Sequence, residues 1–210
     1  MQRSRNGRLA ESSHQNGSSG VNNRRARQRA LAIGIVRDDE HRDDPLAELK
    51  ELLRTAGVAT AGELAQRRSD PDPDRYLGRG KLAELKREIA AADGVLIASP
   101  EYCYSIPGVL KNAIDWVSRP GYKSVLVNKP VAIVGASGSA VGTARGQMHL
   151  REVIFSCLAV TFPHAGVLVA QAATKFDDGR LVDEATREFL ARYLRQFAEF
   201  VATRQVRPGP

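Results

Sequence analysis

The chain has 210 residues, of which 42% are hydrophobic and 26% charged, a composition typical of soluble globular proteins. No apolar run approaches the roughly 20 residues that a membrane-spanning helix needs, and the N-terminus has no apolar segment of the signal-peptide kind. The two Cys residues, Cys103 and Cys157, form no CxxC pair and the four His residues show no metal-ligand spacing, so we expect a cytoplasmic protein without a metal site.

The net charge of +7 is concentrated at the start of the chain. Residues 1–30 hold seven Arg against one Glu, so the remaining 180 residues carry a net charge of only +1. This leaves no basic face for specific nucleic-acid binding by the folded part. Residues 1–28 are rich in Ser, Asn, Gly and Arg and nearly free of aromatic side chains, which predicts a disordered tail with at most weak RNA contact.

Past this tail, short strand-like runs alternate with amphipathic helical segments. Strands are predicted over residues 30–36, 58–66, 94–99, 130–137 and 165–172, and helices over residues 44–57, 81–93, 106–118, 142–160 and 183–205. This alternation is typical of a parallel sheet with helices on both faces. We therefore predict one α/β domain over residues 29–204, with a flavodoxin-like, doubly wound, five-stranded parallel sheet of order 2-1-3-4-5 in three layers.

Two loops follow the third and fourth predicted strands and are expected to meet at the carboxyl edge of the sheet. The first, SPEYCYSIPG (99–108), contains two prolines that stiffen it and two tyrosines that offer flat rings with polar tips. The second, GASGSAVGTARG (135–146), supplies Gly, Ser and Thr residues whose backbone N–H groups can approach a ligand closely. Together they predict a slot for a flat ring with polar edges, and the alternative is a rigid strand-to-helix corner that binds nothing.

The stretch SPEYCYSIPGVLKNAIDWVSRP resembles the signature of the NADPH-dependent FMN reductase family, SPEYN-x-S-x-PG-x-LKNAIDW-x-SRP. The following segment GASGSAVGTARGQMHLR is similar to that family's next motif, and the resemblance runs from about residue 90 to residue 175. It implies a flavodoxin fold, bound FMN, and two-electron transfer from NAD(P)H as co-substrate to a small-molecule acceptor such as a quinone. It also implies a homodimer or homotetramer, in which we expect Trp116, Met148 and Phe155 to lie at the interface.

The site residues follow from the same resemblance. Carried over by position, those expected to border the isoalloxazine ring are Pro100, Glu101, Tyr102, Cys103, Tyr104 and Ser105, and those expected near its far side are Gly135, Ser137 and Gly138. Two positions depart from the family: Cys103 stands where the family has Asn, and Thr143 stands where it has Gly. The first departure removes an amide from the flavin edge. No acid or base residue is assigned, because the cofactor carries the redox chemistry.

The amino-terminal half departs further from that family. Its first predicted strand is followed by RDDEHRDDP (37–45), which has no Gly, Ser, Thr or Asn to cradle a phosphate and carries a local charge of −3. This predicts weakened binding of the FMN phosphate.

Residues 29–92 resemble instead the amino-terminal domain of HflX-type ribosome-associated GTPases, on the stretch ELKELLRTAGVATAGELAQRRSDPDPDRYLGRGKLAELK. No Walker loop is present, so this resemblance does not imply GTP hydrolysis. The chain thus looks like a chimera, natural or engineered, of residues 29–92 and residues 93–204. The alternative function is that of a flavin-free scaffold or a ribosome-directed interaction domain without enzymatic activity.

Overall fold

The computed structural model describes residues 29–35, 47–55, 59–66 and 79–204 of the chain. The predicted basic tail (1–28) and the acidic loop (37–45) lie outside these described residues. The strands are β1 (Arg29–Ile35), β2 (Ala59–Gln66), β3 (Gly94–Ala98), β4 (Pro130–Ala136), β5 (Val160–Thr161), β6 (Val167–Val169), β7 (Phe176–Asp177) and β8 (Arg180–Leu181). The helices are α1 (Ala47–Thr55), α2 (Arg79–Ala91), α3 (Gly108–Val117), α4 (Ala144–Ser156) and α5 (Glu184–Arg204), with 3₁₀ turns η1 (Gly121–Lys123) and η2 (Ala172–Thr174).

The main sheet runs in the order β2-β1-β3-β4-β5, and β6 also pairs with β4. Every strand pair in it is parallel. Parallel neighbours need long crossover connections, and the predicted helices supply them. The structure thus confirms the predicted flavodoxin-like order 2-1-3-4-5, with the first four strands within one residue of their predicted ends.

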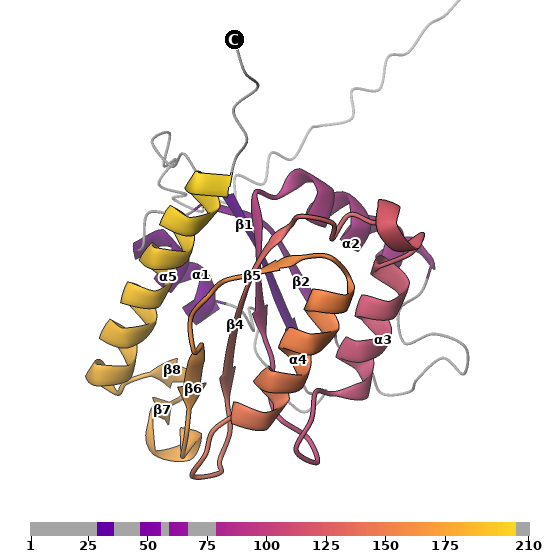
Figure 1. The fold of residues 1–210 in the computed structure, drawn as a ribbon. Helices are drawn as coiled ribbons and strands as arrows, with labels where there is room; N and C mark the ends of the chain where they lie inside the picture. Colours follow the sequence, from indigo (N-terminus) through magenta and orange to yellow (C-terminus); the bar gives the residue numbers. More distant parts are fainter. Residues whose placement is uncertain (1–28, 36–46, 56–58, 67–78, 205–210) are drawn as a thin grey trace, which may run out of the picture.

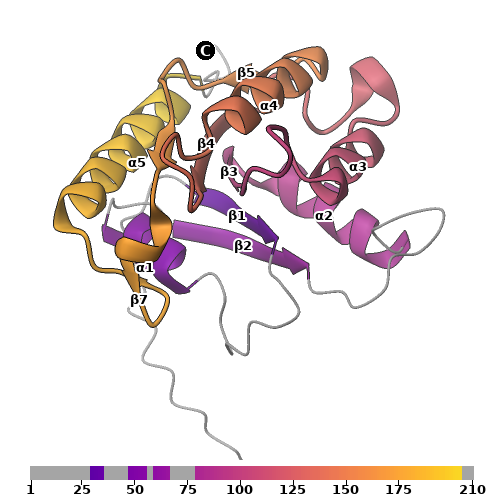
Figure 2. The same cartoon turned by 90° about the horizontal axis from the view of Figure 1, so that it is seen from below.

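Helices cover both faces of this sheet, so the fold has three layers. Figures 1 and 2 show α1 and α5 on one face and α2, α3 and α4 on the other. Successive side chains of a buried strand point to opposite faces, so each strand feeds both cores. Leu96 of β3 packs in one core with Leu53 of α1 and Leu194 of α5, whereas its neighbour Val95 packs in the other core with Ile154 of α4. None of the described helices is long and apolar enough to cross a membrane.

The fifth strand was predicted wrongly as one continuous run over residues 165–172. Its place beside β4 is taken by two short strands, because β5 pairs only with the start of β4 and β6 only with its end. Phe162 still donates its N–H to Val131 O of β4 at 2.7 Å, and its ring packs against the ring of Tyr193 at 5.3 Å between ring centres. The pairing with β4 is interrupted after this residue and resumes at Val167. The Tyr193 hydroxyl fills the gap, since it donates to Ile133 O at 3.0 Å and accepts from Ile133 N at 3.1 Å. A side chain of α5 thus satisfies the backbone groups that a strand would otherwise pair.

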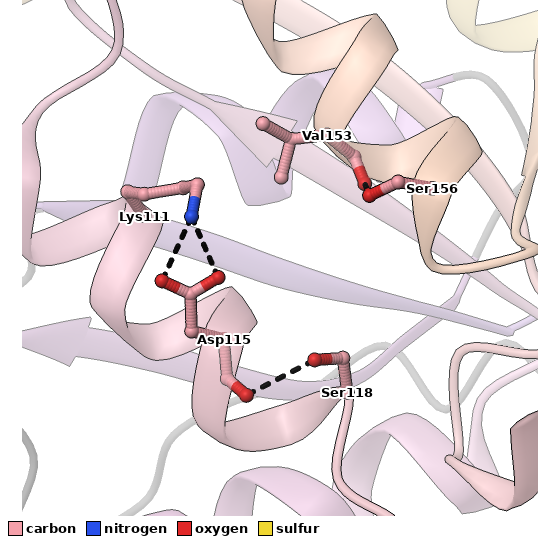
Figure 3. A network of polar contacts seen from close by, with 5 residues as sticks. All are labelled: Lys111, Asp115, Ser118, Val153 and Ser156. Carbon is pink, nitrogen blue, oxygen red and sulfur yellow. Dashed lines mark hydrogen bonds and ion pairs between the residues drawn. The ribbon is translucent and has the colours of Figure 1, made fainter. Parts of the chain in front are cut away.

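The two helices that follow the candidate loops, α3 and α4, carry local polar contacts on their outer surface (Figure 3). Lys111 and Asp115, one turn apart on α3, form an ion pair with an N–O distance of 2.7 Å. The hydroxyls of Ser118 and Ser156 donate to the carbonyls of Asp115 and Val153 at 3.0 and 2.7 Å. All these contacts join residues three or four positions apart, so they support each helix by itself, and exposed pairs of this kind add only a few tenths of a kcal/mol each.

Candidate functional site

The loops after β3 and β4 leave neighbouring strands at the carboxyl edge of the sheet, as their predicted order requires (Figure 2). The backbone ties them at their roots, where Ser99 N donates to Val134 O at 3.0 Å. This edge brings the predicted residues of both loops to one end of the sheet, next to the first turn of α4. In doubly wound folds this edge is where ligands bind.

The first loop contains a tight turn with Cys103 and Tyr104 at its centre. Tyr102 and Ser105 exchange two backbone hydrogen bonds across it, of 3.0 and 2.9 Å. Both central residues have a positive φ, 49° at Cys103 and 62° at Tyr104, as in the primed turns of tight hairpins. Asn and Gly adopt this left-handed region at lower cost than other residues, so the family's Asn at this position suits the turn better than Cys103 does. The departure at Cys103 therefore raises the cost of the turn's backbone conformation.

Glu101 links this loop to the second one. Its Oε2 accepts a hydrogen bond of 2.8 Å from Gly146 N, in the first turn of α4. The first N–H groups of a helix lack partners within the helix, and the helix dipole favours negative charge at this end. The half-buried Glu101 carboxylate thus fixes the start of α4 against the first loop.

The second loop is held largely by its own polar groups. Ser137 Oγ accepts from Ser139 N at 3.2 Å, and Ser139 Oγ donates to Gly142 O at 3.0 Å. Gly138, at the exposed tip, has nothing within 4 Å of the position that a Cβ would occupy. A ligand can therefore approach the backbone closely at Gly138, whereas the Ser137 hydroxyl already has partners inside the loop.

Gly135, the third predicted residue of the second loop, lies in a different environment. It is the penultimate residue of β4 and is buried. A Cβ at this position would come well under 3.0 Å from Ser99 O and 2.5 Å from Thr143 Oγ1. Gly135 therefore allows the two strand ends and the start of α4 to pack together.

Several groups at this edge have no partner in the described part of the chain. The backbone N–H groups of Cys103, Tyr104 and Gly138 donate to no other described residue. The rings of Tyr102 and Tyr104 are half or more exposed. Free donors beside aromatic rings and an open backbone fit a flat ring with acceptor atoms on its edge, and the FMN isoalloxazine is such a ring.

Two residues of α4 contact the first loop, although the sequence suggested for them only a partner-subunit contact or an ordinary polar helix face. The Arg145 guanidinium lies over the Tyr104 ring, 4.1 Å from its centre. His149 Nδ1 lies 3.0 Å from Ser105 Oγ. The two residues are four positions apart and so share one face of α4, a spacing visible in the sequence. Which loop that face meets becomes clear only in the structure.

Metal chemistry has no evident place among the described residues, since no group of three or more His, Cys, Asp or Glu side chains lies together there. The acidic run over residues 37–45 lies outside the described part.

Comparison with known proteins gives matches along most of the chain. The sequence profile of the NADPH-dependent FMN reductase family matches residues 33–174. An NAD(P)H-dependent FMN reductase of Pseudomonas aeruginosa is 44% identical over 153 residues, which cover 70% of this chain and 82% of that protein. A 2-hydroxy-1,4-benzoquinone reductase of a Burkholderia species is 43% identical over 123 residues, 58% of this chain and 67% of that protein.

A similar solved structure is FerB, a flavoenzyme NAD(P)H:(acceptor) oxidoreductase from Paracoccus denitrificans. It superposes with a TM-score of 0.63 at 25% sequence identity, over 84% of this chain and 98% of that chain. The reductase profile begins at residue 33 and runs across residues 92–93, where the sequence suggested a junction between two halves.

Proposed function

Because the chain belongs to the NADPH-dependent FMN reductase family, we propose that it is an NAD(P)H-dependent flavin oxidoreductase that reduces a small quinone-type acceptor. The family uses FMN with NAD(P)H as the electron donor. The observation that carries the proposal is the pairing of the loops after β3 and β4, with free backbone donors beside exposed aromatic rings. The acceptor class rests on similarity to the Burkholderia quinone reductase.

We assign to this chain's residues a binding and orienting role. In this assignment Pro100 to Ser105 border one edge of the flavin ring, and Ser137 and Gly138 lie near its far side. Gly135 contributes by letting the loops pack rather than by touching the ligand. Bound FMN supplies the two-electron chemistry, so the protein needs only to place the rings and limit water. No acid or base residue is proposed.

The experiment that tests this proposal is flavin loading followed by an activity assay. The purified protein is expected to be yellow, or to become so when FMN is added, and then to oxidise NADH or NADPH with a benzoquinone as acceptor. A protein that binds neither FMN nor riboflavin would overturn the proposal. That result would favour the alternative of a flavin-free scaffold or a ribosome-directed domain.

Binding of the FMN phosphate is expected to be weak in this chain. The segment after β1 offers five carboxylates, Asp38, Asp39, Glu40, Asp43 and Asp44, and no hydroxyl or amide side chain. The FMN phosphate dianion would be repelled by these carboxylates if it lay near them. A loop rich in hydroxyl groups would instead donate charge-assisted hydrogen bonds to it. We expect FMN to bind no more than about tenfold more tightly than riboflavin, a difference of roughly 1.4 kcal/mol.

Titration of both flavins into the apoprotein measures this ratio. The matched variant carries a Gly/Ser/Arg/Asn-type loop in place of residues 37–44, and it should restore the preference for FMN with little change for riboflavin. A preference for FMN of about a hundredfold in the unaltered protein would show that a phosphate site exists elsewhere.

We further propose that the chain forms a homodimer or homotetramer through the outer face of α4. Met148 and Phe155, two turns apart on that helix, are 64% and 76% exposed, an unusual position for such large apolar side chains. Trp116 of α3 is partly buried, with Arg119 over its ring. Light scattering at micromolar concentration checks the assembly, and a purely monomeric sample would contradict it.

We also propose the division of the chain into a tail and one domain, its cytoplasmic location and its chimeric origin, on the following grounds. The division into a tail (1–28) and one domain (29–204) rests on composition and on the alternation of predicted strands and helices. A cytoplasmic location rests on the two Cys residues that form no CxxC pair. A chimeric origin rests on the HflX-like resemblance of residues 29–92 and has no support from the comparisons, since the reductase profile spans the suggested junction.

A further inference from the structure

The first two turns of α4 hold the loop after β3 at three of its residues, Glu101, Tyr104 and Ser105. The contacts are Gly146 N to Glu101 Oε2 at 2.8 Å, Arg145 over the Tyr104 ring at 4.1 Å, and His149 Nδ1 to Ser105 Oγ at 3.0 Å. Gly146 lets the loop lie directly on the helix, because a Cβ there would stand only 3.2 Å from Ser105 O. The loop is therefore fixed by a rigid element rather than by its own contacts alone.

The turn in this loop needs such support. Its two central residues, Cys103 and Tyr104, are both non-glycine and both lie in the left-handed region, which costs roughly 1–2 kcal/mol per residue. In the described part of the chain, the backbone of the turn is closed only by the two hydrogen bonds between Tyr102 and Ser105. Contacts from outside the turn must offset the remaining cost. Ser105 makes both kinds of contact: its backbone closes the turn by hydrogen bonds with Tyr102, and its hydroxyl contacts His149 of α4.

We propose that His149 is a positioning residue for the flavin site. By holding Ser105 Oγ it fixes the turn in the conformation that presents the N–H groups of Cys103 and Tyr104. This inference rests on the proposed function, since it gives the turn a ligand to present those groups to. His149 itself touches no ligand in this assignment and acts through Ser105.

The chemistry of the pair suggests a conservative replacement. A Ser hydroxyl both donates and accepts, so it can bond the ring nitrogen of the neutral imidazole and the N–H of the imidazolium alike. The side-chain amide of Asn places an oxygen or nitrogen near the position of Nδ1, whereas Leu has the bulk without polar atoms. His149→Asn should therefore keep the contact that His149→Leu removes.

Flavin affinity gives the first measurement, in the full chain. His149→Leu and Ser105→Ala are each expected to weaken riboflavin and FMN binding by about three- to tenfold, the loss of one hydrogen bond. The double variant should be no weaker than either single one, because both remove the same contact. His149→Asn should stay within about twofold of the unaltered protein. Gln196→Leu, an exposed change on α5 at the opposite face of the sheet, is the control for replacing a polar helix residue by Leu.

Reactivity of the Cys103 thiol gives a second measurement that needs no flavin. Cys103 is exposed at the centre of the turn, so in a Cys157→Ser background its reaction with a disulfide reagent such as Ellman's reagent reports whether the turn is held. His149→Leu should change this rate several-fold, and His149→Asn and Gln196→Leu should not.

The inference is overturned if His149→Leu leaves both flavin affinity and thiol reactivity unchanged, or if its effect adds fully to that of Ser105→Ala. It is also overturned if a folded His149→Asn protein behaves like His149→Leu. If the unaltered protein binds no flavin, the proposed function fails, and the thiol rates still show separately whether His149 holds the turn.

Discussion

Replacing Gly135 by Ala is expected to destabilise the fold by about 3 kcal/mol, near the upper end for overpacking a core. The added Cβ would meet Ser99 O at well under 3.0 Å and Thr143 Oγ1 at 2.5 Å. The carbonyl belongs to the backbone at the end of β3, so it cannot move without separating β3 from β4. For a chain of this length the expected fall in melting temperature is roughly 6–12 °C.

Gly138→Ala is the matched control for that prediction. It makes the same chemical change three residues later, where nothing lies within 4 Å of the new Cβ. Thermal unfolding of the flavin-free proteins should show Gly138→Ala close to the unaltered chain and Gly135→Ala far below it. Equal melting temperatures for the two variants would contradict the packing described for Gly135.

A third variant separates the two contacts at Gly135. Adding Thr143→Gly to Gly135→Ala removes the clash with the hydroxyl but leaves the clash with the Ser99 carbonyl. We therefore expect only partial recovery of the melting temperature. Full recovery would mean that the backbone of Ser99 can move, and that Thr143 alone makes Gly135 necessary.

These two glycines also show what a sequence can reveal about a site. Gly135 and Gly138 stand in one motif and look equivalent, and both were expected near the flavin ring. The structure separates them, because the end of β4 lies under Ser99 and Thr143 whereas the tip of the loop projects beyond them. Residue types and motif order located the loops, but the direction of each residue depends on packing between segments distant in sequence.

The same reasoning explains where the predicted fold succeeded and failed. Long apolar runs such as residues 130–137 carry a strong strand signal, so β3 and β4 were placed within one residue. A strand of two residues, such as β5, offers too short a pattern to recognise, and Pro163 just after it reads as a break. The fifth strand was therefore predicted only at the apolar run of residues 165–172, and only the middle of that run forms a strand, β6.

Tyr193→Phe is expected to destabilise the protein by about 2–3 kcal/mol, although it removes a single oxygen atom. The hydroxyl donates to Ile133 O at 3.0 Å and accepts from Ile133 N at 3.1 Å, and the side chain is fully buried. Without it, both backbone groups lack a partner at the gap between β5 and β6, in a core too apolar to supply one. Urea unfolding measures the loss, and Tyr122→Phe, at a tyrosine that is 84% exposed, should show none.

The ionisation of Tyr193 gives the same prediction a second test. Burial raises the pKa of Tyr193 above its ordinary value of 10.0, because the charged phenolate would lose its water. The unfolded chain therefore releases this proton at lower pH than the folded one, so the contribution to stability is complete below about pH 10 and declines as the pH rises further. In Tyr193→Phe this part of the alkaline decline should disappear, whereas in Tyr122→Phe it should persist. An alkaline unfolding profile that is identical in Tyr193→Phe and the unaltered protein would show that Tyr193 releases its proton at the same pH in the folded and the unfolded chain, so that water reaches its hydroxyl.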